Sequence, residues 1–240
     1  MSATEVIWHD IECGGYREDL PLWRTLARKH SGPILEVGAG TGRVALDLAR
    51  LGHHVTALDR DPDLLGELAA RAAGTTLETI LADARSFTLQ RRFSLCLVPM
   101  QAIQLLGGVE ERAAFLRCAR ACLLPGGALA TALTEVVDEY EVRDGGPAPL
   151  PDMRELDGVV YASRPMAVRV EPDEVVIERL REIVAADGAR EVEENRIVLH
   201  RVGAAELARE GVAAGFAELD RAHIPATEDY VGSEVVVLGA

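Results

Sequence analysis

The 240-residue chain lacks long apolar runs and a cysteine framework, and no secretory leader is expected. No segment approaches the roughly 20 apolar residues of a membrane-spanning helix, and Met1–Glu5 shows no basic flank followed by an apolar stretch. The four cysteines are therefore expected to be reduced thiols in a cytoplasmic protein. No cysteine or histidine group has metal-ligand spacing, so no metal site is predicted.

Basic residues are also scarce, because 25 Lys and Arg stand against 39 Asp and Glu, giving a formal charge of −14. Such a surface repels phosphate backbones, which disfavours a nucleic-acid partner. Hydrophobic residues make up 48% and charged residues 27%, as in ordinary globular proteins. This balance excludes a disordered, collagen-like or coiled-coil chain.

The first half of the chain alternates short apolar segments with amphipathic ones. Val44, Leu48 and Leu51 recur at helical spacing, and Asp61 followed by Pro62 is typical of a helix start. This alternation predicts a parallel sheet covered by helices on both faces, with ligands bound beyond the carboxyl ends of the strands. Strands are expected at residues 33–37, 54–59, 77–81, 93–98 and 128–133, and helices at 42–51, 61–72 and 110–124.

The second half changes character at residue 134. Residues 134–158 are rich in Gly and Pro and are predicted to form a long loop, and residues 159–202 to form three antiparallel strands. The middle strand, at residues 175–184, also fits a helix. A helix at 204–214 and two closing strands at 216–224 and 234–238 follow. The predicted organisation is an N-terminal helical segment with a cofactor-binding core (1–133), a lid loop with a β insertion (134–202), and closing core elements (203–240).

The stretch from Glu36 to Arg43 carries the most chemical information. It places an acidic residue at the end of a strand and then Gly38, Ala39, Gly40 and Gly42 before a helix. Glycines permit a tight turn and a close backbone approach, and the helix start favours an anionic group. Asp59 ends the next strand, where a carboxylate can accept hydrogen bonds from both ribose hydroxyls. Asp83 and Ala84 follow the third strand and could read an adenine edge.

Two kinds of nucleoside cofactor compete for such a turn. Dinucleotide fingerprints require a small residue where Arg43 stands, and Glu36 would repel a pyrophosphate. A sulfonium with a zwitterionic tail is better tolerated beside Glu36. A Walker P-loop is excluded because no Gly-Lys-Ser/Thr follows.

Four motifs in order resemble those of the class I S-adenosylmethionine-dependent methyltransferases. They are Leu35–Gly42, Leu58-Asp59, Leu81–Ala84 and Leu124–Gly127, and the similarity covers roughly residues 16–133. The resemblance implies an α/β fold with a doubly wound, seven-stranded, mostly parallel sheet (a Rossmann-like methyltransferase fold) and an antiparallel last strand. The antiparallel insertion resembles the small capping sheet of glycine and amino-sugar N-methyltransferases.

The resemblance also implies residue roles toward S-adenosyl-L-methionine. Glu36 and the glycine turn would line its methionine part, with Tyr16 closing over that end. Asp59 would hold the ribose, Arg60 would lie beside the adenine, and Asp83 and Ala84 would contact the adenine edge. Met100 and Gln101 would form the wall near the transferable methyl group.

The sequence therefore predicts an enzyme that methylates nitrogen or oxygen of a small-molecule acceptor, without a nucleic-acid or membrane partner. It names no catalytic base and leaves room for a homodimer. Two alternatives stay open. One is a non-catalytic nucleoside-binding regulator, and the other is a dinucleotide-dependent oxidoreductase, which Glu36 and Arg43 disfavour.

Overall fold

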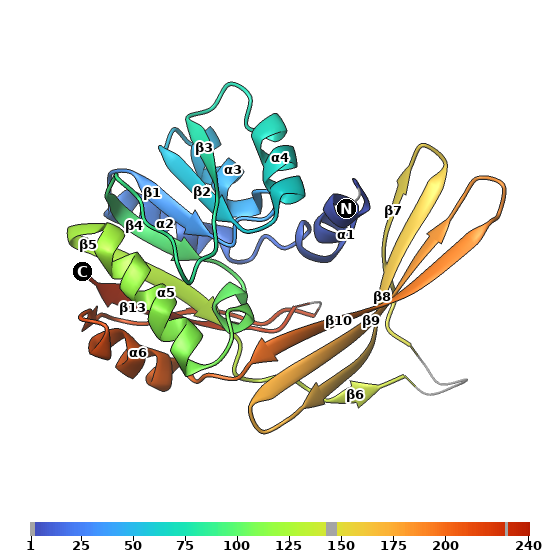
Figure 1. Cartoon of the computed structure of the whole chain (residues 1–240). Helices are drawn as coiled ribbons and strands as arrows, with labels where there is room; N and C mark the ends of the chain where they lie inside the picture. The colour runs from blue at the N-terminus through green and yellow to red at the C-terminus, as the bar shows by residue number, and fades with distance from the viewer. Residues whose placement is uncertain (1–2, 143–147, 229) are drawn as a thin grey trace. The chain divides into compact units, whose positions relative to one another are not determined.

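The computed structural model describes residues 3–142, 148–228 and 230–240, which fold into two compact units (Figure 1). The insertion unit comprises Met1–Gly15 and Val137–Arg201, and the core unit comprises Tyr16–Val136 and Val202–Ala240. This division differs from the expected one at the N-terminus, because the first fifteen residues group with the insertion rather than with the cofactor-binding core. No helix among the described residues is long and apolar enough to cross a membrane.

One sheet organises the core unit, with the strand order β11-β13-β5-β4-β1-β2-β3. Five of its strands run parallel to one another, and β13 (Ser233–Gly239) lies antiparallel to β5. The parallel strands are β1 (Ile34–Val37), β2 (Val55–Asp59), β3 (Leu77–Leu81), β4 (Phe93–Val98) and β5 (Leu123–Leu133). The doubly wound order with an antiparallel closing strand confirms the predicted fold class.

The last edge of this sheet is a single interrupted strand. β11 (Ala217–Glu218) pairs with β13 through Ala217 and Gly239, and β12 (Ala222–Ile224) pairs with it through Ala222 and Val235. Between these two pairs the chain advances five residues from Ala217 to Ala222 but only four along β13, from Val235 to Gly239. A one-residue bulge therefore separates β11 from β12. Together they supply the seventh strand, which was predicted as residues 216–224.

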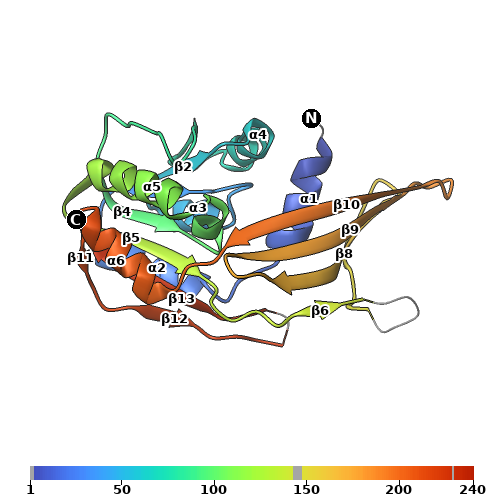
Figure 2. The same ribbon diagram turned by 60° about the horizontal axis from the view of Figure 1, so that its bottom comes forward.

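Helices cover both faces of the core sheet. One hydrophobic cluster joins the sheet to α2 (Leu20–Lys29), α3 (Arg43–Arg50) and α4 (Pro62–Arg71), and a second joins its other face to α5 (Val109–Cys122) and α6 (Ala204–Ala213) (Figure 2). Every residue of β1 and β4 is buried, as expected for largely apolar strands of a sheet that is covered on both faces. The Asp61 carboxylate caps α4 by accepting hydrogen bonds from the Asp63 and Leu64 amides.

The insertion unit contains the three predicted antiparallel strands. They are β8 (Val159–Val170), β9 (Glu174–Val184) and β10 (Arg190–His200). β9 pairs along its length with both neighbours, which resolves its helix-or-strand ambiguity in favour of a strand. Val168, Val175 and Leu199 form its small buried cluster.

Part of the predicted long loop is ordered as strands. β6 (Tyr140–Glu141) and β7 (Asp152–Leu156) both pair with β8. The expectation of a loop was wrong for these residues, because Asp157 and Gly158 adopt positive φ angles of 51° and 79° and form a two-residue hairpin turn. Residues 143–147 of that loop lie outside the described part of the chain.

Helix α1 (Ala3–Cys13) packs on the insertion sheet through a buried charged network. The Glu12 carboxylate accepts hydrogen bonds from Arg181 at 2.8 and 2.9 Å and from the Ser163 hydroxyl at 2.7 Å. The Arg181 guanidinium also lies 5.3 Å from the Trp8 ring centre. These contacts explain why the first residues belong to the insertion unit.

Candidate functional site

The glycine turn after β1 is held against the end of β2 by backbone hydrogen bonds. The Gly38 and Ala39 amides both donate to the Leu58 carbonyl, at 2.9 and 3.2 Å. Gly42 has φ 90° and begins α3, and a Cβ atom there would lie 2.1 Å from a Leu68 methyl group. Only glycine satisfies both the conformation and the close packing at this position.

Asp59 joins the turn to the following strand end. One carboxylate oxygen, Oδ2, accepts a hydrogen bond from the Gly40 amide at 2.8 Å, and Oδ1 accepts one from the Asp61 amide at 3.0 Å. A carboxylate can accept about four hydrogen bonds, so acceptor capacity remains on each oxygen. The structure therefore fixes the Asp59 carboxylate at the carboxyl edge of the sheet, beside the glycine turn.

Glu36 lies beneath this turn and is almost completely buried, with 2% of its surface exposed. Its Oε2 atom has no hydrogen-bond partner among the described residues. Burial raises the pKa of Glu36 to about 8, while the charge of Arg43 opposes this rise and the charges of Asp19 and Asp59 add to it. An unsatisfied buried carboxyl group is rare in folded proteins and indicates a place for a ligand.

A buried ion pair beside Glu36 was not predicted from the sequence. The Arg43 guanidinium donates to both oxygens of Asp19, at 2.5 and 2.7 Å, and the Trp23 indole donates to Asp19 Oδ2 at 2.7 Å. Asp19 precedes α2 as a capping residue would, yet its side chain makes no cap hydrogen bond. The sequence carries no local signal for this role because Arg43 lies 24 residues away.

Tyr16 packs against this ion pair. The Arg43 guanidinium carbon lies 5.1 Å from the Tyr16 ring centre, and Arg43 also donates to the Tyr16 carbonyl at 3.1 Å. The hydroxyl is buried without a partner in the described chain, and burial, together with the charge of Asp19, raises the pKa of Tyr16 to about 12. The ring centre of Tyr230 lies 4.9 Å from that of Tyr16, and Tyr230 was not predicted from the sequence as a site residue.

Asp83 and Ala84 follow β3 at the same edge of the sheet, since the Ala82 amide donates to the Asp59 carbonyl at 2.9 Å. Asp83 is engaged by its neighbour Arg85, which donates to its two oxygens at 2.9 and 2.5 Å. These hydrogen bonds lower the pKa of Asp83 to about 2. Arg60 is exposed at this end, and Ala84 is buried.

Met100 and Gln101 follow β4 on a loop that touches the glycine turn. A Cβ atom at Gly38 would lie 3.0 Å from that of Ala102, so this loop forms a wall of the turn. Met100 adopts a positive φ of 54°. Gln104, which was not predicted as a site residue, exchanges two hydrogen bonds with the Thr134 backbone at 3.1 and 2.9 Å and thereby ties this loop to the end of β5.

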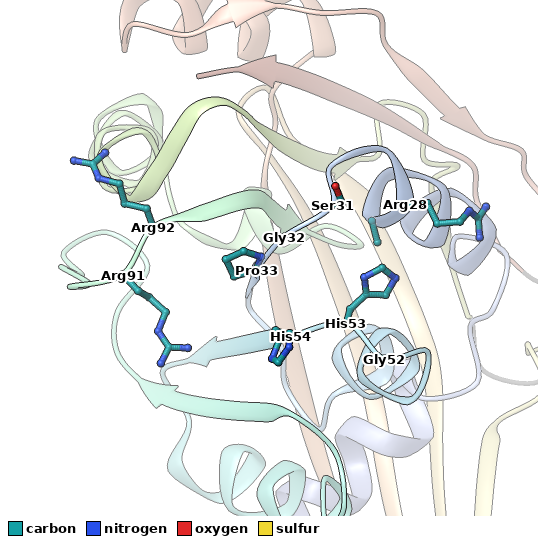
Figure 3. A pocket seen from close by; sticks show the side chains of 10 residues that line it. Arg28, Ser31, Gly32, Pro33, Gly52, His53, His54, Arg91 and Arg92 are labelled. Carbon is teal, nitrogen blue, oxygen red and sulfur yellow. The ribbon is translucent and has the colours of Figure 1, made fainter.

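A hollow lies at the opposite, amino edge of the core sheet (Figure 3). It has a volume of about 740 Å³ and is open to solvent. None of the described residues that line it is acidic. The lining includes Arg28, His53, His54, Arg91 and Arg92.

The carboxyl edge thus gathers the predicted residues Tyr16, Glu36 and Asp59 with the glycine turn and the loop after β4. Within the described residues, no group of three or more His, Cys, Asp or Glu side chains could hold a metal ion. What the edge offers is the Asp59 carboxylate, which has acceptor capacity left, and two buried polar atoms that have no partner among the described residues. This donor set suits an organic ligand with both a cationic and a hydroxylated part.

Comparisons with known proteins agree with this arrangement. Residues 34–127 match the family model described as "Methyltransferase domain". A ubiquinone biosynthesis O-methyltransferase of Methylocella silvestris is 35% identical over 121 residues, which cover 46% of this chain and 43% of that protein. The matched region therefore spans less than half the length of this relative.

Two solved structures share the fold over nearly the whole chain. An amino pentose methyltransferase from Micromonospora echinaspora superposes with a TM-score of 0.72 at 21% identity, covering 99% of this chain and 97% of that one. A sugar N-methyltransferase from a Streptoalloteichus species superposes with a TM-score of 0.72 at 18% identity, covering 98% and 92%. At these identities the likeness establishes the common fold.

Proposed function

We propose that this protein transfers a methyl group from S-adenosyl-L-methionine to a nitrogen or oxygen of a small-molecule acceptor, and that residues 34–127, which match the methyltransferase domain model, form its class I S-adenosylmethionine-dependent methyltransferase domain. The observation that best supports this function is a pair of buried polar atoms at the glycine turn that have no hydrogen-bond partner among the described residues. They are Oε2 of Glu36 and the hydroxyl of Tyr16, and each needs a hydrogen-bonding partner that the described protein does not supply.

The residues at this edge fit the proposed cofactor. Glu36 and the glycine turn are positioned for its amino-acid part, which includes a cationic ammonium group, and Tyr16 closes over the same part. The free lone pairs of Asp59 suit the ribose hydroxyls. The adenine is assigned to the region of Arg60, Asp83 and Ala84. Because Arg85 engages Asp83, the Ala84 amide is the simpler contact for the adenine edge.

When bound, S-adenosyl-L-methionine supplies a methyl group activated by a sulfonium. The protein's contribution is to position the acceptor atom in line with that methyl, and orientation of this kind can contribute roughly 7–11 kcal/mol. Met100 and Gln101, on the wall tied down by Gln104, are the proposed neighbours of the reacting atoms. No catalytic base is assigned, and one is needed only if the acceptor atom is protonated at the working pH.

The proposed acceptor is small and not a nucleic acid. The net charge of −14 opposes a polyanionic partner, and a sugar N-methyltransferase shares the fold over 98% of this chain. An amine on a sugar is therefore the first acceptor class to test. A cytoplasmic location and a homodimer remain proposals, to be checked by cell fractionation and by light scattering on the purified protein.

Calorimetry and thermal-shift measurements with separate ligands test the cofactor. We expect S-adenosyl-L-methionine and S-adenosyl-L-homocysteine to bind and to raise the melting temperature, and NAD to do neither. Asp59→Asn should weaken binding of both adenosyl compounds, whereas Asp220→Asn, an exposed control in the same unit, should not. Stabilisation by NAD alone would overturn the proposal.

A methyl-transfer screen then tests the enzyme assignment. The protein would be incubated with methyl-labelled S-adenosyl-L-methionine and amino sugars, other amines, phenols and carboxylates, and products would be detected by mass. Label transfer to an amine or hydroxyl supports the proposal. Cofactor binding with no transfer across the panel would instead favour a non-catalytic nucleoside-binding regulator.

A further inference from the structure

Three carboxylates surround the glycine turn, and only one of them lacks settled partners. Asp19 is held by Arg43 and Trp23, and Asp59 accepts two backbone amides. Glu36 is as deeply buried as Asp19, yet its Oε2 atom receives no hydrogen bond from any described residue. A charged carboxylate in that position would lack both water and donors, which is strongly unfavourable.

The charged groups that face Glu36 do not stabilise a negative charge on its carboxyl group. Among the described residues, Arg43 on α3 is the only cation that faces it, and its guanidinium already donates to both oxygens of Asp19. Asp19, before α2, and Asp59, at the end of β2, add negative charge, while Tyr16 is neutral at ordinary pH. The surroundings therefore carry a net negative charge without counting Glu36, which favours the protonated form of its carboxyl group.

We propose that Glu36 is a neutral acid in the ligand-free protein and that it releases its proton to solvent when the cationic cofactor binds beside it. This inference rests on the proposed function, because the incoming cation is the ammonium and sulfonium of S-adenosyl-L-methionine. In the bound state, the Glu36 carboxylate and the ligand cation neutralise each other, and one proton appears in the buffer for each ligand bound. Cofactor affinity is consequently coupled to pH.

The direction of the coupling follows from the two protonation states. At low pH the proton must be displaced from Glu36 before the carboxylate can pair with the ligand, so binding is weak. Affinity should rise about tenfold per pH unit, the limit for release of one proton, until the empty site itself begins to ionise. The amino group of the cofactor loses its own proton only near pH 7.7–8.0, the usual α-amino range. A window from pH 6 to 7 therefore isolates the protein's contribution.

Calorimetry of S-adenosyl-L-methionine binding to the full chain at pH 6.5 measures the proton directly. The observed enthalpy is plotted against the ionisation enthalpy of three buffers, and the slope is the negative of the number of protons released, because the buffer takes those protons up. We expect close to one proton for the wild type and close to none for Glu36→Gln. Asp59→Asn removes a carboxylate from the same site, and it should weaken binding while leaving the proton count unchanged.

A spectroscopic measurement covers the case in which Glu36→Gln fails to fold or to bind. The infrared difference spectrum between free and cofactor-bound wild-type protein at pH 6.5 should show the loss of a protonated-carboxyl C=O band. Binding with no proton release and no such band would overturn the inference and leave the proposed function intact. Failure of the cofactor to bind at any pH would overturn both.

Discussion

The two edges of the core sheet differ in how their polar groups are satisfied. The amino edge has a wide hollow lined by arginines and histidines that water can solvate, and Arg91 there also pairs with Glu78 at 2.8 Å. The carboxyl edge buries Glu36 and the Tyr16 hydroxyl and leaves polar atoms of both without partners. Solvated charges need no ligand, whereas buried unpartnered groups do. Buried polar atoms that lack hydrogen-bond partners therefore identify the ligand site better than the volume of a hollow does.

Matched glycine substitutions at the two edges should give the largest contrast. Gly42 and Gly52 both have φ 90°, but a Cβ atom at Gly42 would clash with Leu68 at 2.1 Å, while nothing lies within 4 Å of one at Gly52. Gly42→Ala should lower the free energy of unfolding by roughly 3–5 kcal/mol, and Gly52→Ala by about 1 kcal/mol of backbone strain. Urea denaturation measures both, and equal losses would contradict the packing argument.

Removing the Glu36 charge should produce a pH-dependent gain in stability. The folded pKa of about 8 lies above the ordinary glutamate value of 4.5, so the contribution of Glu36 is fully present below pH 4.5 and is lost as pH rises through 8. Ligand-free Glu36→Gln should therefore become more stable than the wild type at pH 9, by on the order of 2–4 kcal/mol relative to the difference at pH 5. Thermal unfolding at the two pH values checks this, and a difference that does not vary with pH would argue against a neutral Glu36.

The ribose-type acceptor should matter for binding more than for folding. Asp59→Asn keeps the shape of the side chain but replaces one acceptor oxygen by a donor, which opposes the Gly40 amide or a ribose hydroxyl. We expect the Kd for S-adenosyl-L-homocysteine to rise by roughly 10- to 100-fold, equivalent to about 1.4–2.7 kcal/mol. Calorimetry gives this value, and an unchanged Kd would remove Asp59 from the site.

The smallest effect is expected at the amino edge. Replacing Arg28 and Arg92 together by Ala removes two cations from the hollow, and neither makes a salt bridge to any residue that the structure describes. Cofactor affinity should change less than about twofold, within roughly 0.4 kcal/mol, because exposed charges on the far side of a sheet are screened. A tenfold loss would show that the two edges are coupled.

The sequence was sufficient to predict those structural features that depend only on residues close together in the chain. The glycine turn, the Asp61 cap before Pro62 and the continuous apolar strands each depend on residues that are close in sequence, and the structure contains all three. The sequence also contained the signal for the hairpin at Asp157-Gly158, because an Asp-Gly pair strongly favours a two-residue turn. It was missed because the surrounding Gly and Pro residues suggested a continuous loop.

The roles of residues whose partners are distant in the sequence could not be predicted from the sequence. Asp19 became a buried partner of Arg43 only when α2 and α3 packed together, and Tyr230 reached Tyr16 only when the segment before β13 returned to the sheet. The middle insertion strand, whose apolar spacing suits a helix or a strand, was decided by pairing with β8 and β10. Helix α1 was assigned to the insertion unit by the contacts of Glu12 with Arg181 and Ser163.

The amino-acid sequence by itself determined the α/β class, the order of the core elements and the presence of an acidic, glycine-rich turn, because periodicity and turn chemistry act over a few residues. Only the tertiary structure decided which polar groups around that turn are satisfied. Hydrogen bonding and burial depend on side chains that folding brings together from separate segments, and the unpartnered state of Glu36 is the result of all of them at once.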